Sequence, residues 1–192
     1  SLSVVSGAQA AESGASSTLD LARLVPGLAI GQNSGDGAFP FISLRGVAMR
    51  DFADTNESPS AVYVNEFYKA NLMGLDSQMF DVSRIEVLRG PQGTLYGRNA
   101  TGGLIHFIAA APTEELQGHF NATIAERNRV QVEGAISGKI AGNLLGRLSV
   151  YRRRYDGYIK NTFPGGENGN DLSTSAIRGQ LSNEFSDNLS AE

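Results

Sequence analysis

The second half of the chain alternates apolar and polar residues over unusually long segments. In 130–137 every second residue is Val, Gly or Ile, and the residues between them are polar or small. The pattern recurs in 144–151 and 175–185, and more weakly in 120–124. A period of two is typical of β-strands with one apolar and one polar face. The apparent strands have about 9–13 residues, whereas strands of soluble proteins usually have ~5–6 and membrane-crossing strands need ~9–11.

The connections between these strands differ in length. Asn143 follows a tight Gly-containing turn, whereas 161–172 is a long polar segment. Short turns at one end and long loops at the other are typical of outer-membrane barrels. Tyr151, Tyr155 and Tyr158 are candidates for an interfacial belt of aromatic side chains. The alternation by itself fits equally well a soluble antiparallel sheet with one face in water.

The first half, residues 1–113, predicts a small mixed α/β unit. Strands are expected at 2–5, 41–44, 61–64, 85–88 and 104–108, and loops at 31–37 and 48–60. A helix is expected over 19–25, with Thr18 as its N-cap and Pro26 at its end. A weaker helical stretch is expected over 72–80, and His106 is expected to be packed within its strand.

The amino-acid composition argues against several classes of fold and function. The chain has 23 Gly among its 192 residues, which disfavours a helix-rich fold because Gly in a helix interior costs about 1 kcal/mol relative to Ala. The absence of Cys excludes disulfides and thiolate sites. A net charge of −4 argues against a nucleic-acid binder. With two His and no visible set of nucleophile and base, we expect no enzyme, no cofactor and no metal site.

The densest run of glycines lies in 89–103. A phosphate-binding P-loop would need Gly-Lys followed by Ser or Thr, but Gly97 is followed by Arg98 and Asn99. The spacing also fails to match the dinucleotide fingerprint G-x-G-x-x-G between a strand and a helix. The run therefore favours turns and close backbone packing over phosphate binding.

Several motifs together resemble the plug domain of TonB-dependent outer-membrane receptors. Residues 85–103 read IEVLRGPQGTLYGRNATGG and match the family's block almost residue for residue. Residues 24–28 (LVPGL), 42–46 (ISLRG) and 62–65 (VYVN) are similar to its earlier motifs, although Asn65 and the next residue replace the usual Asp-Gly. Downstream, 147–149 and similar segments resemble the family's first barrel strands.

The resemblance implies an α+β plug domain over 1–113, a small mixed sheet with short helices. Residues 114–192 would be the first four or so strands of an antiparallel transmembrane β-barrel, left incomplete. Because receptors of this kind close barrels of about 22 strands, and open edges are not viable in lipid, we expect the chain to be a fragment cut at both ends.

The resemblance also implies transport without catalysis. The expected function is energised uptake of a scarce nutrient, such as a ferric siderophore, across the bacterial outer membrane, with the plug gating the barrel lumen. The expected partners are TonB of the inner-membrane energising complex, a small-molecule cargo and outer-membrane lipid. The alternative is a stand-alone periplasmic plug-like module for binding or interaction, without transport.

Two groups of site residues follow from the family, and a third, the turn glycines, follows from the residues themselves. Arg45 and Arg89 would pair with barrel-wall glutamates and lock the plug in place, because an Arg fork holds a carboxylate bidentately, and Glu86 would join this network. The glycines expected to serve turns are Gly46, Gly90, Gly93, Gly97, Gly102 and Gly103. The candidate contacts to cargo, in loops 31–40, 47–60 and 66–78, are Asn33, Asp36, Phe39, Arg50, Phe52 and Lys69.

Overall fold

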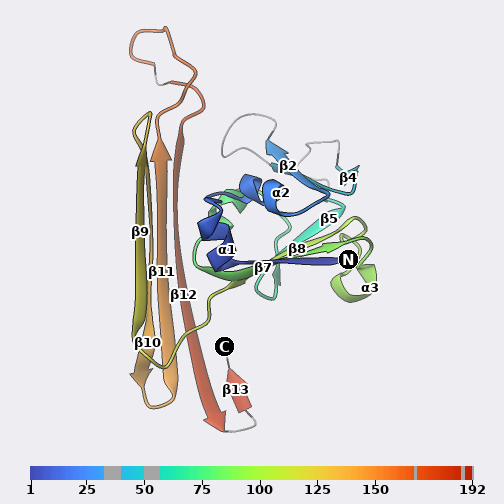
Figure 1. Cartoon of the computed structure of the whole chain (residues 1–192), viewed down its shortest axis with the longest axis vertical. Coiled ribbons are helices and arrows are strands. Elements are labelled where there is room, and N and C mark those ends of the chain that lie inside the picture. The colour runs from blue at the N-terminus through green and yellow to red at the C-terminus, as the bar shows by residue number, and fades with distance from the viewer. Residues whose placement is uncertain (33–39, 50–56, 167, 187–188, 192) are drawn as a thin grey trace. The chain divides into compact units, whose positions relative to one another are not determined.

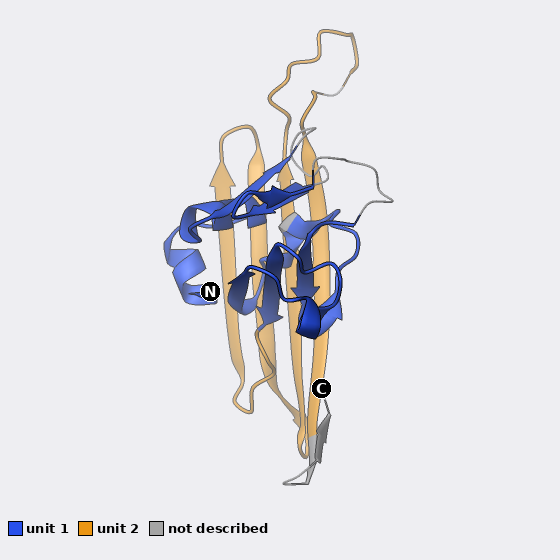
Figure 2. Ribbon diagram, turned by 90° about the vertical axis from the view of Figure 1, so that its right-hand side faces the viewer, with its two compact units in different colours: residues 1–109 blue, residues 110–192 orange. Residues whose placement is uncertain are grey.

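The computed structural model describes residues 1–32, 40–49, 57–166, 168–186 and 189–191. The chain divides into two compact units, residues 1–109 (unit 1) and residues 110–192 (unit 2), which Figure 2 colours separately. Each unit has its own sheet structure and is described by itself. In the described part of the chain, no helix is both long enough and apolar enough to cross a membrane.

Unit 1 is built on a mixed five-stranded sheet with the order β1-β7-β8-β5-β6. Its strands are β1 (Leu2–Ser6), β5 (Ser60–Val64), β6 (Phe67–Tyr68), β7 (Val82–Arg89) and β8 (Gly103–Ala109). The pair β5 and β8 is parallel, and the other neighbours are antiparallel. All four strands expected in this sheet are present, and β7 begins three residues earlier than expected because Val82 and Arg84 pair with the end of β8.

A second, smaller antiparallel sheet and short helices complete unit 1. The sheet has the order β2-β3-β4, and its strands are β2 (Leu28–Gln32), β3 (Pro40–Leu44) and β4 (Val47–Ala48). The helices are α1 (Gly7–Glu12), the 3-10 helix η1 (Thr18–Asp20), α2 (Leu21–Leu24), the 3-10 helix η2 (Leu75–Gln78) and α3 (Gly93–Tyr96). The sequence did not predict β2. Its last two residues, Gly31 and Gln32, were expected to begin a polar loop, but they pair with β3.

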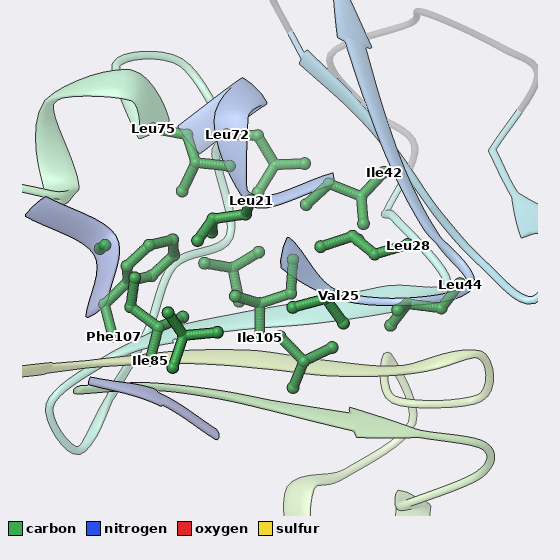
Figure 3. Packing of buried hydrophobic residues seen from close by; sticks show 14 residues of the cluster. Leu21, Val25, Leu28, Ile42, Leu44, Leu72, Leu75, Ile85, Ile105 and Phe107 are labelled. Carbon is green, nitrogen blue, oxygen red and sulfur yellow. The ribbon is translucent and has the colours of Figure 1, made fainter. Parts of the chain in front are cut away.

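The core of unit 1 lies between its sheets and helices. Figure 3 shows Leu21 of α2, Ile42 of β3 and Phe107 of β8 pointing into one apolar cluster, although they are far apart in the sequence. Phe107, Leu21 and Ile105 have no exposed surface. Burying such side chains contributes about 1.5–3 kcal/mol each relative to exposure, so this cluster holds the two sheets together.

The helix expected over 19–25 is divided, and its N-cap differs from the expectation. Ser17 precedes η1, and α2 follows at once and ends at Leu24. Thr18 is not the cap, because its hydroxyl donates to the Leu75 carbonyl oxygen (2.8 Å) and is buried. Local spacing identified the helical segment, and a contact with η2, more than fifty residues away, decided the role of Thr18.

Unit 2 is an antiparallel meander of long strands, seen side by side in Figure 1. The strands are β9 (Gln117–Ala125), β10 (Arg129–Ala141), β11 (Leu144–Tyr155), β12 (Leu172–Ser186) and β13 (Leu189–Ala191). A two-residue turn at Gly142 and Asn143 joins β10 to β11, whereas residues 156–171 separate β11 from β12. The long strands and unequal connections agree with the alternation in the sequence.

The two faces of this sheet are inverted relative to those of a soluble protein. On one face, which we call the apolar band, large apolar side chains are exposed. These are Phe120, Ile124, Ile136, Leu148, Val150, Ile177 and Leu181. The opposite face carries buried polar and aromatic side chains, namely Ser137, Ser149, Tyr151, Arg153 and Tyr155. Strand pairing places each set on one face, because directly paired residues share a face.

The expected aromatic belt is wrong for two of its three tyrosines. Tyr151 and Tyr155 are buried on the polar face, opposite the side of Leu148 and Val150 on the same strand. The reason is the strand period of two, which sends odd and even residues of β11 to opposite faces. Tyr158 is 56% exposed and lies beyond the end of β11.

Candidate functional site

Arg89 lies at the end of β7 and binds two other segments of unit 1. Its Nη1 donates to the Pro26 carbonyl oxygen (2.8 Å) and its Nη2 donates to the Ser3 hydroxyl (2.7 Å). Its Nε is buried and has no hydrogen-bond partner in the described part of the chain. The guanidinium is therefore fixed at the junction of β1, β7 and the segment after α2.

Arg45 approaches the same region from the turn between β3 and β4. Its Nη2 donates to the Ser1 hydroxyl (2.9 Å), and its backbone amide donates to the Gly27 carbonyl oxygen (2.8 Å). Arg45 has a positive φ of 52° and is exposed. The structure thus brings Arg45 and Arg89, 44 residues apart in sequence, to the N-terminal residues Ser1 and Ser3 and to the Pro26–Gly27 turn.

Neither of these arginines forms an ion pair with a carboxylate among the described residues. Glu86, expected in the same network, instead pairs with Arg84, with 2.7 Å between Oε1 and Nε. Residues 86 and 89 also point to opposite faces of β7, because a strand alternates its side chains. The structure therefore brings the two arginines together and leaves Glu86 apart from them.

The glycine-rich loop after Arg89 is closed by its own backbone. The Gly90 amide donates to the Gly102 carbonyl oxygen (3.0 Å), the Gln92 amide to Ala100 (2.8 Å), and the Gly102 amide to Pro59 (2.8 Å). A phosphate-binding loop needs free amides that point at an anion. Because these amides bind carbonyl groups of the chain, the loop is a structural turn.

Close packing explains the glycine at position 103 most directly. A Cβ there would collide with the backbone carbonyl of Leu88 and approach Leu44 Cδ1 to 2.8 Å, and φ is +141°. At Gly102 a Cβ would lie 3.0 Å from Val47 Cγ1. The expected turn glycines with positive φ are Gly46, Gly90, Gly97 and Gly103. Gly93 has neither a positive φ nor a close neighbour, so geometry does not require glycine there.

An aromatic cluster, which the sequence analysis did not identify, holds the loop against β5. The Tyr63 ring lies 5.3 Å from that of Tyr96 and 5.6 Å from that of Tyr68, measured between centroids. The Tyr63 hydroxyl donates to the Tyr96 carbonyl oxygen (3.1 Å), and Asn99 Nδ2 donates to the Tyr68 hydroxyl (2.7 Å). His106 is buried in β8, as expected, and its Nε2 contacts the Asn65 carbonyl oxygen.

Five of the six candidate cargo contacts, Asn33, Asp36, Phe39, Arg50 and Phe52, lie outside the described residues. The sixth, Lys69, follows β6 and is half-buried. Its amide donates to the Val62 carbonyl oxygen (2.8 Å). Glu57, near the end of the expected loop 47–60, forms an ion pair with Arg98, with 3.0 Å between Oε1 and Nη2.

Asp20 of η1 is a carboxylate with a shifted pKa. Burial raises its pKa, but hydrogen bonds from the Ser16 amide (3.0 Å) and the Ser17 hydroxyl (3.0 Å), with the ion pair to Arg23, lower it more. The pKa of Asp20 is therefore below its ordinary value. This carboxylate organises the start of η1, and its environment is that of a helix cap.

The sequence is similar to known receptors over most of its length. The family model of the TonB-dependent receptor plug domain matches residues 1–104. The pesticin receptor of Yersinia pestis is 33% identical over 168 residues, which cover 87% of this chain and 24% of that protein. The vitamin B12 transporter BtuB of Vibrio vulnificus is 24% identical over 100% of this chain and 31% of its own length. The chain thus spans about a quarter to a third of these curated relatives.

Solved structures give the same result. The ferric yersiniabactin uptake receptor FyuA from Yersinia pestis superimposes with a TM-score of 0.80 at 32% identity, over 95% of this chain and 28% of that one. The outer-membrane ferripyoverdine receptor of Pseudomonas aeruginosa has a TM-score of 0.76 at 21% identity, over 97% of this chain and 23% of its own, and shows the shared fold alone. The chain belongs to the family of TonB-dependent outer-membrane receptors, of which it spans the plug domain and the strands that follow it.

Proposed function

We propose that the protein containing this chain is an outer-membrane receptor that takes up a ferric siderophore with energy delivered through TonB. Unit 1 acts as the plug, and the strands of unit 2 form part of a barrel wall. The observation that carries this proposal is the apolar band of unit 2. Exposed side chains such as Ile177 (73%) and Phe120 (71%) form a continuous face, which in water would be an aggregation hazard.

The apolar band also argues against the stand-alone periplasmic module. That alternative requires residues 114–192 to bury their apolar face within a soluble sheet. In unit 2 the apolar face is the exposed one, and polar side chains such as Ser149 are buried. An outer-membrane barrel strand has this arrangement, apolar toward lipid and polar toward the lumen.

The cargo is inferred from the two relatives with the highest identities given above. One is named as a receptor for pesticin and the other as an uptake receptor for ferric yersiniabactin. We propose an iron-loaded siderophore as the class of cargo, bound by plug loops that include Lys69. The reaction is transport, in which no covalent bond of the cargo changes.

Arg45 and Arg89 are proposed to hold the plug in the barrel. Both lack a carboxylate partner among the described residues of this chain, and their hydrogen bonds fix them at one place in unit 1. A guanidinium fork offers five donors, of which these contacts use only some. Carboxylates on the barrel wall would accept the remaining hydrogen bonds and neutralise both charges.

Uptake of radioactive iron tests the proposal. The complete receptor is produced in a Gram-negative host without its own siderophore receptors, and cells are given ferric yersiniabactin labelled in the metal. We expect accumulation that stops when TonB is deleted or when an uncoupler collapses the proton gradient. Accumulation that continues without TonB would contradict the energised mechanism. TonB-dependent uptake of cyanocobalamin in place of the ferric complex would contradict the siderophore as cargo.

A further inference from the structure

On β11 the apolar side chains are followed by two arginines, toward the long loop. Along β11, Leu148 and Val150 are exposed on the apolar face, and Arg152 and Arg154 continue the same face. Each step of two residues moves about 6.8 Å along a strand. The guanidinium groups therefore follow directly after the apolar side chains along β11.

Arg152 is held flat on this face by the neighbouring strand. Its Nη1 donates to the Ser175 hydroxyl and its Nη2 donates to the Ser173 hydroxyl (3.1 Å). Strand pairing places Arg152 between Val132 of β10 and Ser175 of β12. Because the guanidinium has five donors, three remain after these two bonds. The serines thus orient the fork, and an anion can bind its unused edge.

Arg154 stands one row further toward the long loop. Strand pairing places it between Val130 and Ser173, and its side chain is exposed. Among the residues that the structure describes, no carboxylate forms an ion pair with Arg152 or Arg154. Two adjacent positive charges on a lipid-facing surface are costly unless an anion neutralises them.

The same end of the sheet carries other charged groups, mostly in its turn and loop. Asp156 follows Arg154 by two residues, and its carboxylate accepts a hydrogen bond from Asn128 Nδ2 (2.7 Å). Asp171 precedes Ser173 and Glu126 lies in the β9–β10 turn, both exposed. Arg127, in the same turn, lies over the Tyr158 ring with 5.8 Å from its Cζ to the centroid. Along β11 the two arginines therefore come directly after the apolar side chains, and the carboxylate of Asp156 comes after them.

We propose that Arg152 and Arg154 bind the phosphate of a membrane lipid headgroup whose acyl chains lie along the apolar band. Arginine suits this task because its fork matches phosphate geometry and keeps its charge at any physiological pH. The inference rests on the proposed barrel in the outer membrane, where long loops mark the extracellular side. The lipid is then one of the outer leaflet, with phosphate close to its acyl chains.

Lipid binding by the complete receptor in detergent tests this site. The probe is a fluorescent diphosphoryl lipid A, compared with the same lipid after enzymatic removal of its phosphates. The double variant Arg152→Gln/Arg154→Gln is expected to weaken binding of the phosphorylated lipid roughly 25-fold, at about fivefold for each charge. The matched control Lys139→Gln removes an exposed cation near the short turn at the other end of β10 and should change affinity less than twofold.

A charge-preserving variant separates binding from folding. Arg152→Lys/Arg154→Lys keeps both charges but loses the forks, so we expect affinity between that of the wild type and that of the glutamine variant. Equal affinities of the wild type and the glutamine variant would overturn the site. Equal binding of the dephosphorylated lipid, or full displacement by millimolar inorganic phosphate without the lipid chains, would overturn a lipid headgroup as its ligand.

The outcome stays distinguishable from failure of the proposed function. Heat-dependent electrophoretic mobility of the receptor in outer-membrane fractions reports whether a folded barrel is present. A receptor that never forms a heat-modifiable barrel contradicts the proposed membrane location. A folded, inserted receptor whose lipid affinity ignores both arginines contradicts only this inference.

Discussion

The two units of this chain place their apolar side chains in opposite ways. In unit 1, Phe107 and Ile105 are fully buried in a cluster between sheets and helices. In unit 2, Ile177 and Phe120 are exposed on one face of a long sheet. The hydrophobic effect acts on both units, but their surroundings differ, because the core of unit 1 is enclosed by its own sheets and helices and lipid is expected to face the band of unit 2. What an exposed apolar side chain means for a protein therefore depends on whether water or lipid faces it.

The contrast between the two units would fail most clearly if the core of unit 1 tolerated truncation of a buried side chain. Phe107→Ala leaves a cavity in the cluster of Figure 3 and is expected to lower the free energy of unfolding of unit 1 by about 3–5 kcal/mol. Hydrogen exchange of the β7 and β8 amides in the complete receptor measures this loss. Phe120→Ala, on the exposed band, is expected to leave exchange in unit 1 unchanged. Similar exchange in both variants would contradict a separate core in unit 1.

A charge on an exposed apolar residue sharpens the comparison. Ile177→Arg is expected to cost more than about 1 kcal/mol, because the side chain faces lipid about 6.8 Å further from the headgroups than Arg152, and the cost of a charge grows from ~0–1 kcal/mol at the interface to ~2–4 kcal/mol at mid-membrane depth. Phe67→Arg, in unit 1, is the matched control, since Phe67 is 79% exposed and Ile177 is 73% exposed. In water such a substitution changes stability by no more than about 0.5 kcal/mol. The folded fraction in membranes, from heat-dependent mobility, measures both, and equal values would mean that both residues meet the same solvent.

Removal of the plug arginines probes how unit 1 is anchored. Arg89→Gln loses the bonds to Pro26 and Ser3, and we expect β1 to open more easily by about 1.5–3 kcal/mol. Arg45→Gln is expected to have a smaller effect on β1, because its exposed side chain forms a hydrogen bond only to Ser1 among the described residues. Exchange of the β1 amides measures this opening. Arg98→Gln, 82% exposed, serves as the control, and an equal effect there would remove the special role of Arg89.

Acid is expected to have the smallest effect and to act on unit 1 at η1. The pKa of Asp20 is lowered in the folded state, so its stabilising contribution is complete above the unfolded value of about 3.9 and is lost as pH falls through the folded pKa. Asp20→Asn should remove about 1 kcal/mol of local stability at neutral pH and abolish this acid dependence. Protection factors of the Ser16 and Ser17 amides between pH 7 and pH 3 measure it. An unchanged acid dependence in Asp20→Asn would assign it to another group.

Sequence patterns identified most of the regular structure where local information suffices. The long strands of unit 2 and the strands around 61–64, 85–88 and 104–108 follow from alternation and turn residues. The helix α1 was missed, although Ser6 and Gln9 form a capping box that the sequence displays as Ser-x-x-Gln. The strand β2 was missed for a different reason, because its glycine and glutamine belong to a strand only through pairing with β3.

The candidate site likewise has features that the sequence predicted and features that it did not. The motif residues were found from the family resemblance, and their backbone roles at Gly90 and Gly103 agree with the geometry. The partners of Arg89 were not predictable, since Ser3 and Pro26 lie 86 and 63 residues away in the sequence. The aromatic cluster around Tyr63 was also missed, because three tyrosines at irregular spacing meet only after β5, β6 and α3 have packed.

The sequence by itself determined the period of each strand, the places of the turns and the family of this protein. These depend on neighbours along the chain and on motifs long enough to be specific. Only the tertiary structure decided which face of β11 carries Tyr151, where the two plug arginines meet, and that Arg152 and Arg154 extend the apolar band. The physical reason is that strand register and packing join residues distant in sequence, and a shift of one residue would reverse every face.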